Sequence, residues 1–385
     1  MLQLTIPVYH VNLKPSELLN SAREIVPFYG RDDDLDDLYR WCRQKGDDPI
    51  DVRLYTGEGG VGKTRLMRQL CRQMLRDDNG WRVGFLQIDP DEKQDFAALC
   101  EPERPTLVVI DDATLYADKL HEFINEIDRY INQRSSTRKR TAPFRVVLLA
   151  RTAGDWWDKV KTQASSANQS SVEPRVVTPL GAESRTETFE QAVTAFAKAR
   201  NYDAVPEHQT LSATLDREPF GRILLIHMLA LLTVERSPDQ TNASETRILD
   251  DILTLEERHW APLHTKERIL SDRLFRRDDA RQMVRHLLCL ATLGYRIEDE
   301  DHLIELCDNL QQLGLNRLRK AERKRLATTL GDLYRNNSTD SNEDRTDLLL
   351  PPLKPDLLGE HLIETTLFDA KEEEITDEGE EIFAH

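Results

Sequence analysis

A glycine-rich segment at residues 57–64, with the sequence GEGGVGKT, constrains the fold of this chain more than any other feature. The segment fits the pattern G-x-x-x-x-G-K-[ST], whose backbone wraps around phosphate groups and points its N–H groups at them. The apolar run VRLYTG (52–57) leads into it, and the helical pattern that follows has one apolar face, formed by Leu66, Met67, Leu70, Met74 and Leu75. This order predicts one unit of a parallel α/β sheet, with the loop at the carboxyl end of the strand.

Further strands are expected at four apolar runs, which cover residues 83–88, 106–111, 145–150 and 175–180. Each run is too short for a helix and rich in β-branched residues. Helical patterns separate the runs, so we expect a parallel sheet with helices on both faces. From about residue 183 the chain reads as helical, apart from a polar loop (336–347) and a strand-like run, LLLPPL (348–353).

These patterns predict an α/β P-loop NTPase domain that is followed by two helical parts. The expected divisions are a lead-in segment (1–28), the P-loop NTPase domain (29–182), an all-α helical domain (183–272), a winged-helix domain (273–366) and an acidic tail or linker (367–385). The winged-helix prediction rests on helices followed by a polar excursion between apolar segments.

Composition narrows the class of protein and its partners. The chain has 385 residues, of which 39% are hydrophobic and 31% charged, as in globular proteins of two or three domains. Its five scattered cysteines predict buried, reduced thiols, and neither a secretory signal nor an apolar run of membrane-spanning length is evident, so we expect a cytoplasmic protein without a membrane partner. A net charge of −17 disfavours nucleic acid as a partner, because an acidic chain repels phosphate backbones. Two basic stretches (134–145 and 317–325) read as solvated surfaces, with a docking patch for a partner or nucleic acid as the alternative.

The glycine-rich loop and the strand ends next to it supply the candidate catalytic and metal-binding groups. Lys63 would reach the β- and γ-phosphates, and the Thr64 hydroxyl would bind Mg²⁺. At the end of the strand TLVVID, Asp111 would hold the Mg²⁺ shell through water, and Asp112 would orient or deprotonate the attacking water. Arg151, at the end of the next strand, could read the γ-phosphate. The remaining nucleotide-binding candidates in this region are Gly57, Gly59, Gly60, Val61, Gly62 and Arg65.

Several segments together resemble the STAND class of P-loop ATPases, in particular bacterial multidomain members related to apoptotic and plant-resistance ATPases. The resemblance covers roughly residues 25–366. Its pieces are PFYGR (27–31) with Leu35 and Leu38, the P-loop, VVIDD (108–112), LLAR followed by GDWW (148–157), and PDLLGE (355–360). Of the adjacent tryptophans in GDWW, one is expected to pack inward.

The resemblance implies further ligand contacts. Tyr29, Gly30 and Arg31 would lie against the base, and Pro219 would lie over the adenine. The family's histidine before the aspartate of the last helix is absent here, because Pro355 precedes Asp356. His361 could substitute for it, but a surface position on the helix is the preferred interpretation. The sequence also lacks a guanine-reading motif near a strand end, which favours adenine.

The resemblance also implies a mechanism. Such proteins rest as ADP-bound monomers, exchange ADP for ATP when a trigger opens a hinge after the helical domain, and self-associate to activate an effector. The implied ligands are ATP or ADP with Mg²⁺, and hydrolysis would be slow. Effector and sensor modules would lie beyond this chain or on other chains, in defence, signalling or transcriptional regulation.

Two other functions stay open at this point. The basic stretch at 317–325 motivates an initiator-like ATPase that loads on DNA through its winged helix. A small-molecule P-loop kinase is the third possibility, and the long helical portion of the chain disfavours it.

Overall fold

The computed structural model describes residues 2–4, 13–44, 49–77, 80–88, 94–100, 104–135, 142–163, 173–205, 211–235, 244–260, 278–312, 318–335 and 348–377. The polar loop 336–347, Arg317, residues 136–141 of the first basic stretch, the predicted boundary at 272/273 and the last part of the acidic tail (378–385) lie outside these ranges.

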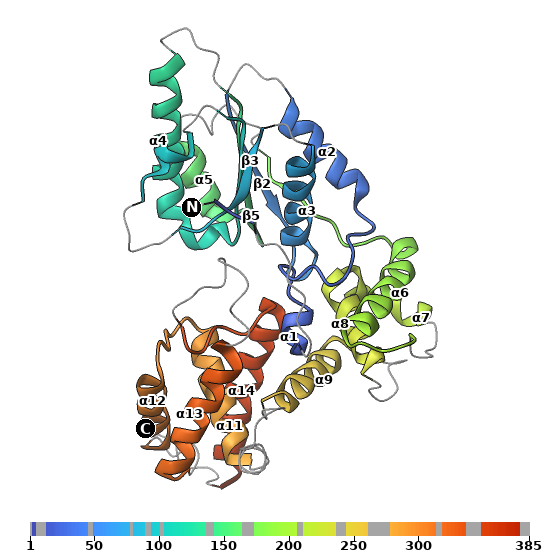
Figure 1. The fold of residues 1–385 in the computed structure, drawn as a ribbon, viewed down its shortest axis with the longest axis vertical. Helices are drawn as coiled ribbons and strands as arrows, with labels where there is room; N and C mark the ends of the chain where they lie inside the picture. Colours follow the sequence, from blue (N-terminus) through green and yellow to red (C-terminus); the bar gives the residue numbers. More distant parts are fainter. Residues whose placement is uncertain are drawn as a thin grey trace. The chain divides into compact units, whose positions relative to one another are not determined.

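The chain divides into two compact units (Figure 1). The first comprises Met1–Ile6, Val26–Gln191 and Leu211–Ile226, and the second Pro7–Ile25, Ala192–Thr210 and His227–His385. The four domain boundaries expected from the sequence stay predictions.

The first unit is built on a six-stranded sheet, which confirms the predicted α/β class. Its strands, in spatial order, are β1 (Leu2–Gln3), β3 (Arg82–Leu86), β4 (Thr106–Ile110), β5 (Phe144–Ala150), β2 (Ile50–Thr56) and β6 (Arg175–Val176). All neighbours pair in parallel except β1 and β3, which are antiparallel.

The two edge strands differ from the expectation. The lead-in segment contributes β1, and Gly84 makes room for it, because a Cβ on Gly84 would lie 2.9 Å from the carbonyl oxygen of Gln3. The run at 175–180 pairs only over β6. Its later residues leave the sheet, where the Leu180 N–H donates to the carbonyl of Gly221 at 2.7 Å.

Helices cover both faces of the sheet (Figure 1). One face carries α2 (Asp32–Arg43) and α3 (Lys63–Arg76), and the other carries α4 (Ala117–Ser135) and α5 (Gly154–Gln163). The side chains of β4 alternate between the two cores, as strand geometry requires: Val108 and Ile110 pack toward α4, and Leu107 and Val109 toward α3. On α3 the predicted apolar face is buried except at Leu75, which is 50% exposed at the end of the helix.

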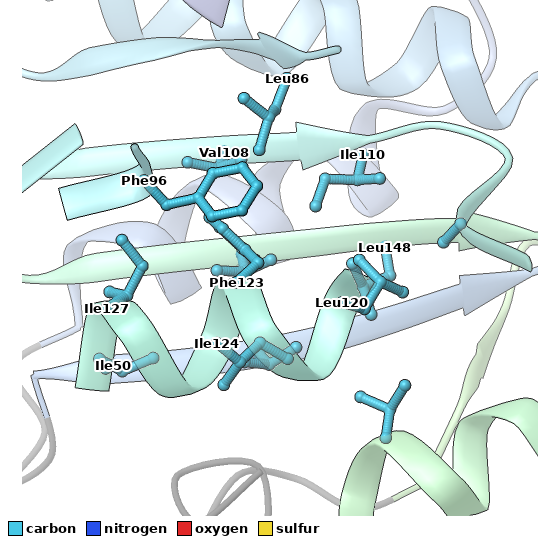
Figure 2. Packing of buried hydrophobic residues seen from close by; sticks show 14 of the residues in the cluster. Ile50, Leu86, Phe96, Val108, Ile110, Leu120, Phe123, Ile124, Ile127 and Leu148 are labelled. Carbon is cyan, nitrogen blue, oxygen red and sulfur yellow. The ribbon is translucent and has the colours of Figure 1, made fainter. Parts of the chain in front are cut away.

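Phe123 of α4 lies at the centre of one core (Figure 2). It is fully buried, and its ring meets that of Phe96 edge to face with centroids 5.1 Å apart. Phe96 belongs to the short helix η1 (Phe96–Cys100). The packing therefore joins α4, η1 and the sheet.

We expect Phe123→Ala to lower the free energy of unfolding by about 3–5 kcal/mol, because it removes a large buried ring and leaves a cavity. Urea denaturation of both proteins measures this difference. Leu75→Ala is the control, and its half-exposed side chain should cost less than about 1 kcal/mol. Equal losses for the two variants would contradict this description of the core.

The second unit is helical. Its named helices are α1 (Pro15–Leu18), α9 (Glu245–Arg258), α11 (Asp278–Thr292), α12 (Glu300–Gln312), α13 (Lys320–Arg335) and α14 (Asp356–Asp377), with the later parts of α6 (Ala182–Ala199) and α8 (Ile223–Val234). The predicted strand-like run at 348–353 makes one antiparallel bridge, between Leu350 and Ile297. The acidic stretch continues α14 to Asp377, since glutamate, lysine and alanine favour helix.

The acidic helix α9 is fastened by three polar contacts inside this unit. Fully buried Glu256 accepts hydrogen bonds from the backbone and hydroxyl of Ser16, at 2.9 and 2.8 Å. Glu257 pairs with Arg285 of α11 at 3.4 Å. Asp250 lies 2.7 Å from His361 of α14, which is only 5% exposed. The expected surface position of His361 is therefore wrong, because that face of α14 packs on α9.

Candidate functional site

The predicted site residues of the first unit meet at one edge of the sheet. Strands β2, β4 and β5 are parallel neighbours, with Thr56 opposite Ala150 and Ile110 opposite Leu148. Their carboxyl ends therefore lie together, and each is followed by a predicted group: the glycine-rich loop, Asp111 with Asp112, and Arg151.

The glycine-rich loop has the backbone shape of a phosphate cradle. Gly60 and Gly62 adopt positive φ angles of 78° and 104°, which other residues reach only with strain. Val61 between them is 1% exposed and anchors the loop in the core. Lys63 Nζ donates to the carbonyls of Gly57 and Glu58 at 2.7 and 3.0 Å. The ammonium group is thus held against the loop, at the N-terminus of α3.

A hydroxyl and a carboxylate stand beside this loop. Thr64 Oγ1 donates to Asp111 Oδ2 at 2.7 Å, so the two groups expected to bind Mg²⁺ are brought together. Hydroxyl and carboxylate oxygens are ligands that Mg²⁺ prefers, and the pair fits that ion. Asp112 follows in the left-handed region, with φ of 47°, and its N–H donates to Asp111 Oδ1 at 3.1 Å.

Arg151 lies against the loop from the end of β5. Its backbone carbonyl accepts a hydrogen bond from Gly57 N–H at 3.2 Å. Its guanidinium Nη2 is 3.6 Å from the place that a Cβ on Gly59 would occupy. The structure therefore brings Arg151 together with the P-loop, as the sequence predicted.

The side chain of Arg31 is hydrogen-bonded to backbone carbonyls of the loop and of a neighbouring segment. The residue is 5% exposed, and its guanidinium donates to the carbonyls of Val61 and Thr178, at 2.9 and 2.7 Å, and to Asp34 at 3.0 Å. Gly30 packs on Leu180, and Tyr29 is 37% exposed. Arg31 thus joins three segments next to the phosphate cradle, while the base contacts of residues 29–31 stay predictions.

The other sequence candidates are more loosely connected to the loop. The Arg65 guanidinium lies 5.6 Å over the ring of Phe28 and donates to Gln69 at 3.4 Å. Pro219 is half-buried in the short helix η3 (Glu218–Gly221). Of the adjacent tryptophans, Trp157 is 3% exposed, which confirms that one packs inward.

A contact that the sequence did not reveal comes from the first turn of α8. The Leu224 N–H donates to the Gly60 carbonyl at 3.0 Å. A Cβ on Gly60 would lie 3.0 Å from Leu224 Cβ, and one on Gly62 would lie 3.3 Å from Ile223 Cδ1. Arg222, directly before this turn, pairs with Glu58 of the loop at 3.8 Å. The only local signal for this contact is an arginine shortly after Pro219, at the start of an apolar helix.

Some arginines of the two basic stretches are buried or paired, and so are less available to solvent or a docking partner than the sequence predicted. Arg145 is 3% exposed and donates to the carbonyl of Gln44 at 2.8 Å, so a solvated or docking role is wrong for this residue. In α13, Arg323 pairs with Asp308 of α12 and hydrogen-bonds Gln311.

All five cysteines are buried and free, as predicted. Burial raises the pKa of Cys42 and of Cys307 to about 12, so these thiols stay protonated at neutral pH. In the part of the chain that the structure describes, no helix is long and apolar enough to cross a membrane.

Comparison with known proteins yields one family match. The family described as Novel STAND NTPase 5 matches residues 31–163, which contain the loop, Asp111, Asp112 and Arg151. No curated protein matches the chain significantly.

Solved structures show distant similarity. The ORC2 protein of Aeropyrum pernix, in ADPNP and ADP complexes, is 14% identical over 93% of this chain and 98% of that one, with a TM-score of 0.40. CDC6P from Pyrobaculum aerophilum is 14% identical over 94% and 100%, with a TM-score of 0.37. The Hsp104–ADP complex of S. cerevisiae is 13% identical over 92% and 54%, with a TM-score of 0.38.

Proposed function

We propose that this chain, a STAND-class P-loop NTPase by its family match over residues 31–163, works as an ATP/ADP-dependent signalling switch that hydrolyses ATP slowly and self-associates when activated. The observation that carries this proposal is the 2.7 Å contact between Thr64 and Asp111, next to a loop that holds Lys63. A hydroxyl and a carboxylate in this arrangement suit Mg²⁺, and an ammonium group beside them suits the phosphates of a triphosphate.

The chain's own residues would divide the work as follows. The loop's N–H groups and Lys63 bind the phosphates, and Thr64 and Asp111 hold Mg²⁺, which neutralises phosphate charge when bound. Asp112 orients or deprotonates the attacking water, and Arg151 contacts the γ-phosphate. The adenine contacts belong to Tyr29, Gly30, Arg31 and Pro219.

A switch needs a resting arrangement that can be broken, and α9 supplies candidate contacts. Its carboxylates meet Ser16, Arg285 and His361, which come from three other segments of the second unit. We assign the resting state to this set of contacts, because each joins α9 to another element of the second unit. The family's histidine before the aspartate of the last helix is absent, since Pro355 precedes Asp356, and we assign part of its locking role to these contacts.

Nucleotide-dependent assembly tests the switch. We expect a monomer with ADP, and an oligomer with ATP and Mg²⁺, when the molar mass is measured by light scattering after size exclusion. Lys63→Ala should stay monomeric with either nucleotide. A mass that is the same with ATP and ADP, or normal assembly of Lys63→Ala, would contradict the proposal.

The effector and sensor would be further modules in cis or partners in trans, in signal transduction such as antiviral defence.

DNA loading through a winged helix in the second unit is the second candidate. Lys320, Lys324 and Arg325 of α13 are exposed and favour it, whereas the net charge of −17 opposes it. Duplex binding that weakens steeply with salt would support this function. Absent or salt-independent binding would exclude it.

A further inference from the structure

Arg222 is held close to the phosphate cradle by the chain on both sides of it. On one side, the Gly221 carbonyl accepts from Leu180 N–H at 2.7 Å, and a Cβ on Gly221 would lie 2.7 Å from Pro179 Cβ. On the other, Leu224 N–H binds the Gly60 carbonyl at 3.0 Å. The position of Arg222 beside the loop is therefore fixed by its backbone, independently of its side chain.

A second arginine, Arg185, holds the segment that precedes Arg222. Arg185, 8% exposed, donates to the carbonyls of Leu180, Leu215 and Arg217, at 2.9, 2.9 and 3.1 Å. These bonds tie the segment before Arg222 to residue 180, which also packs on Gly30. The backbone at Arg222 is thus held by hydrogen bonds next to the glycine-rich loop.

The side chain of Arg222 faces a carboxylate of the loop. Its Nε lies 3.8 Å from Glu58 Oε2, and the two side chains are 16% and 73% exposed. Charge-assisted hydrogen bonds are shorter, at roughly 2.7–2.9 Å, so this is a loose ion pair. A guanidinium can bind a phosphate bidentately, and a nucleotide phosphate carries more negative charge than a carboxylate. An incoming phosphate can therefore displace Glu58 from Arg222.

We propose that Arg222 exchanges Glu58 for a phosphate oxygen of the bound nucleotide, with Glu58 as its counter-ion in the empty site. This inference rests on the proposed nucleotide binding and adds a phosphate contact outside residues 57–65. Glu58 then has two effects on the affinity, because its carboxylate competes for Arg222 and repels the phosphates. Since Arg222 directly precedes α8, the exchange also links phosphate binding to the start of that helix.

The two partners should respond in opposite directions. We expect Arg222→Ala to weaken ATP binding about tenfold and Arg222→Lys to weaken it less, since lysine keeps the charge without the fork. Glu58→Gln should strengthen binding roughly two- to fivefold, as expected from the loss of one exposed charge contact. Calorimetric titration of each variant with ATP, and with ADP, measures these ratios.

The sign of the Glu58→Gln effect separates the proposal from a structural role. If the pair only stabilised the loop, breaking it from either side would weaken binding. Weaker binding by Glu58→Gln, or unchanged binding by Arg222→Ala, would therefore overturn the inference. Arg76→Ala is the matched control, because it removes an exposed arginine at the far end of α3, roughly 20 Å from Lys63 by helix rise.

Two further measurements make the failures distinguishable. Thermal unfolding of each variant shows whether it is folded. If wild type itself does not bind ATP, the proposed function fails. If wild type binds, Lys63→Ala does not, and the Arg222 and Glu58 variants behave as wild type, only this inference fails.

Discussion

Replacing Lys63 with alanine should lower the affinity for ATP by about a hundredfold or more, which is the largest effect on affinity that we expect from one substitution. Lys63 Nζ lies against the loop carbonyls of Gly57 and Glu58 at 2.7 and 3.0 Å, so its charge is already in place before phosphate arrives. Removing one partner of a close charge pair costs about 2–5 kcal/mol, and about 2.7 kcal/mol corresponds to a hundredfold change.

Titration calorimetry with ATP and Mg²⁺ measures this loss. Lys161→Ala provides the matched control, because Lys161 pairs with Asp158 on α5 at 2.7 Å, outside the loop. Its affinity should equal that of wild type. Binding by Lys63→Ala at near wild-type affinity would mean that the loop is not the phosphate site.

Asp111→Asn should reduce ATP hydrolysis by roughly a hundred- to a thousandfold, a loss of the size seen when one preorganised electrostatic group is removed. Asparagine keeps the shape and an oxygen that can accept the Thr64 hydroxyl, whose present bond is 2.7 Å long. The change therefore removes the negative charge that Mg²⁺ needs with little disturbance of the loop.

Phosphate release at increasing Mg²⁺ concentrations tests this expectation, with a higher Mg²⁺ requirement as the specific signature. Asp77→Asn is the control, since Asp77 caps the far end of α3 from Thr64 and is exposed. Wild-type turnover and Mg²⁺ dependence in Asp111→Asn would remove Asp111 from the metal site.

The central strands and the loop between β2 and α3 could be predicted because their signals are local. β2, β4 and β5 are almost wholly buried, so each is a short apolar run that the sequence displays directly. The residues at the carboxyl ends of these strands then follow from parallel topology alone. For the same reason parallel topology puts Asp111 and Arg151 at the sheet edge that carries the loop, while their catalytic roles stay predictions.

The features that escaped prediction depend on partners far along the chain. The short β1 exists because Gly84 leaves space for Gln3. Arg145 looks like part of a basic surface until the carbonyl of Gln44 is seen beside it. His361 looks exposed until Asp250 of α9 is in place. Arg222 belongs to the site only because Leu224 binds Gly60. Local periodicity contains none of these pairings.

The nucleotide that the purified protein carries tests the ADP-locked switch most directly. The protein would be purified without added nucleotide and denatured, and the released ligand identified by chromatography and mass spectrometry. The account predicts nearly one ADP per chain, retained by the glycine-rich loop. An empty site, or ATP bound to a monomer, would contradict it.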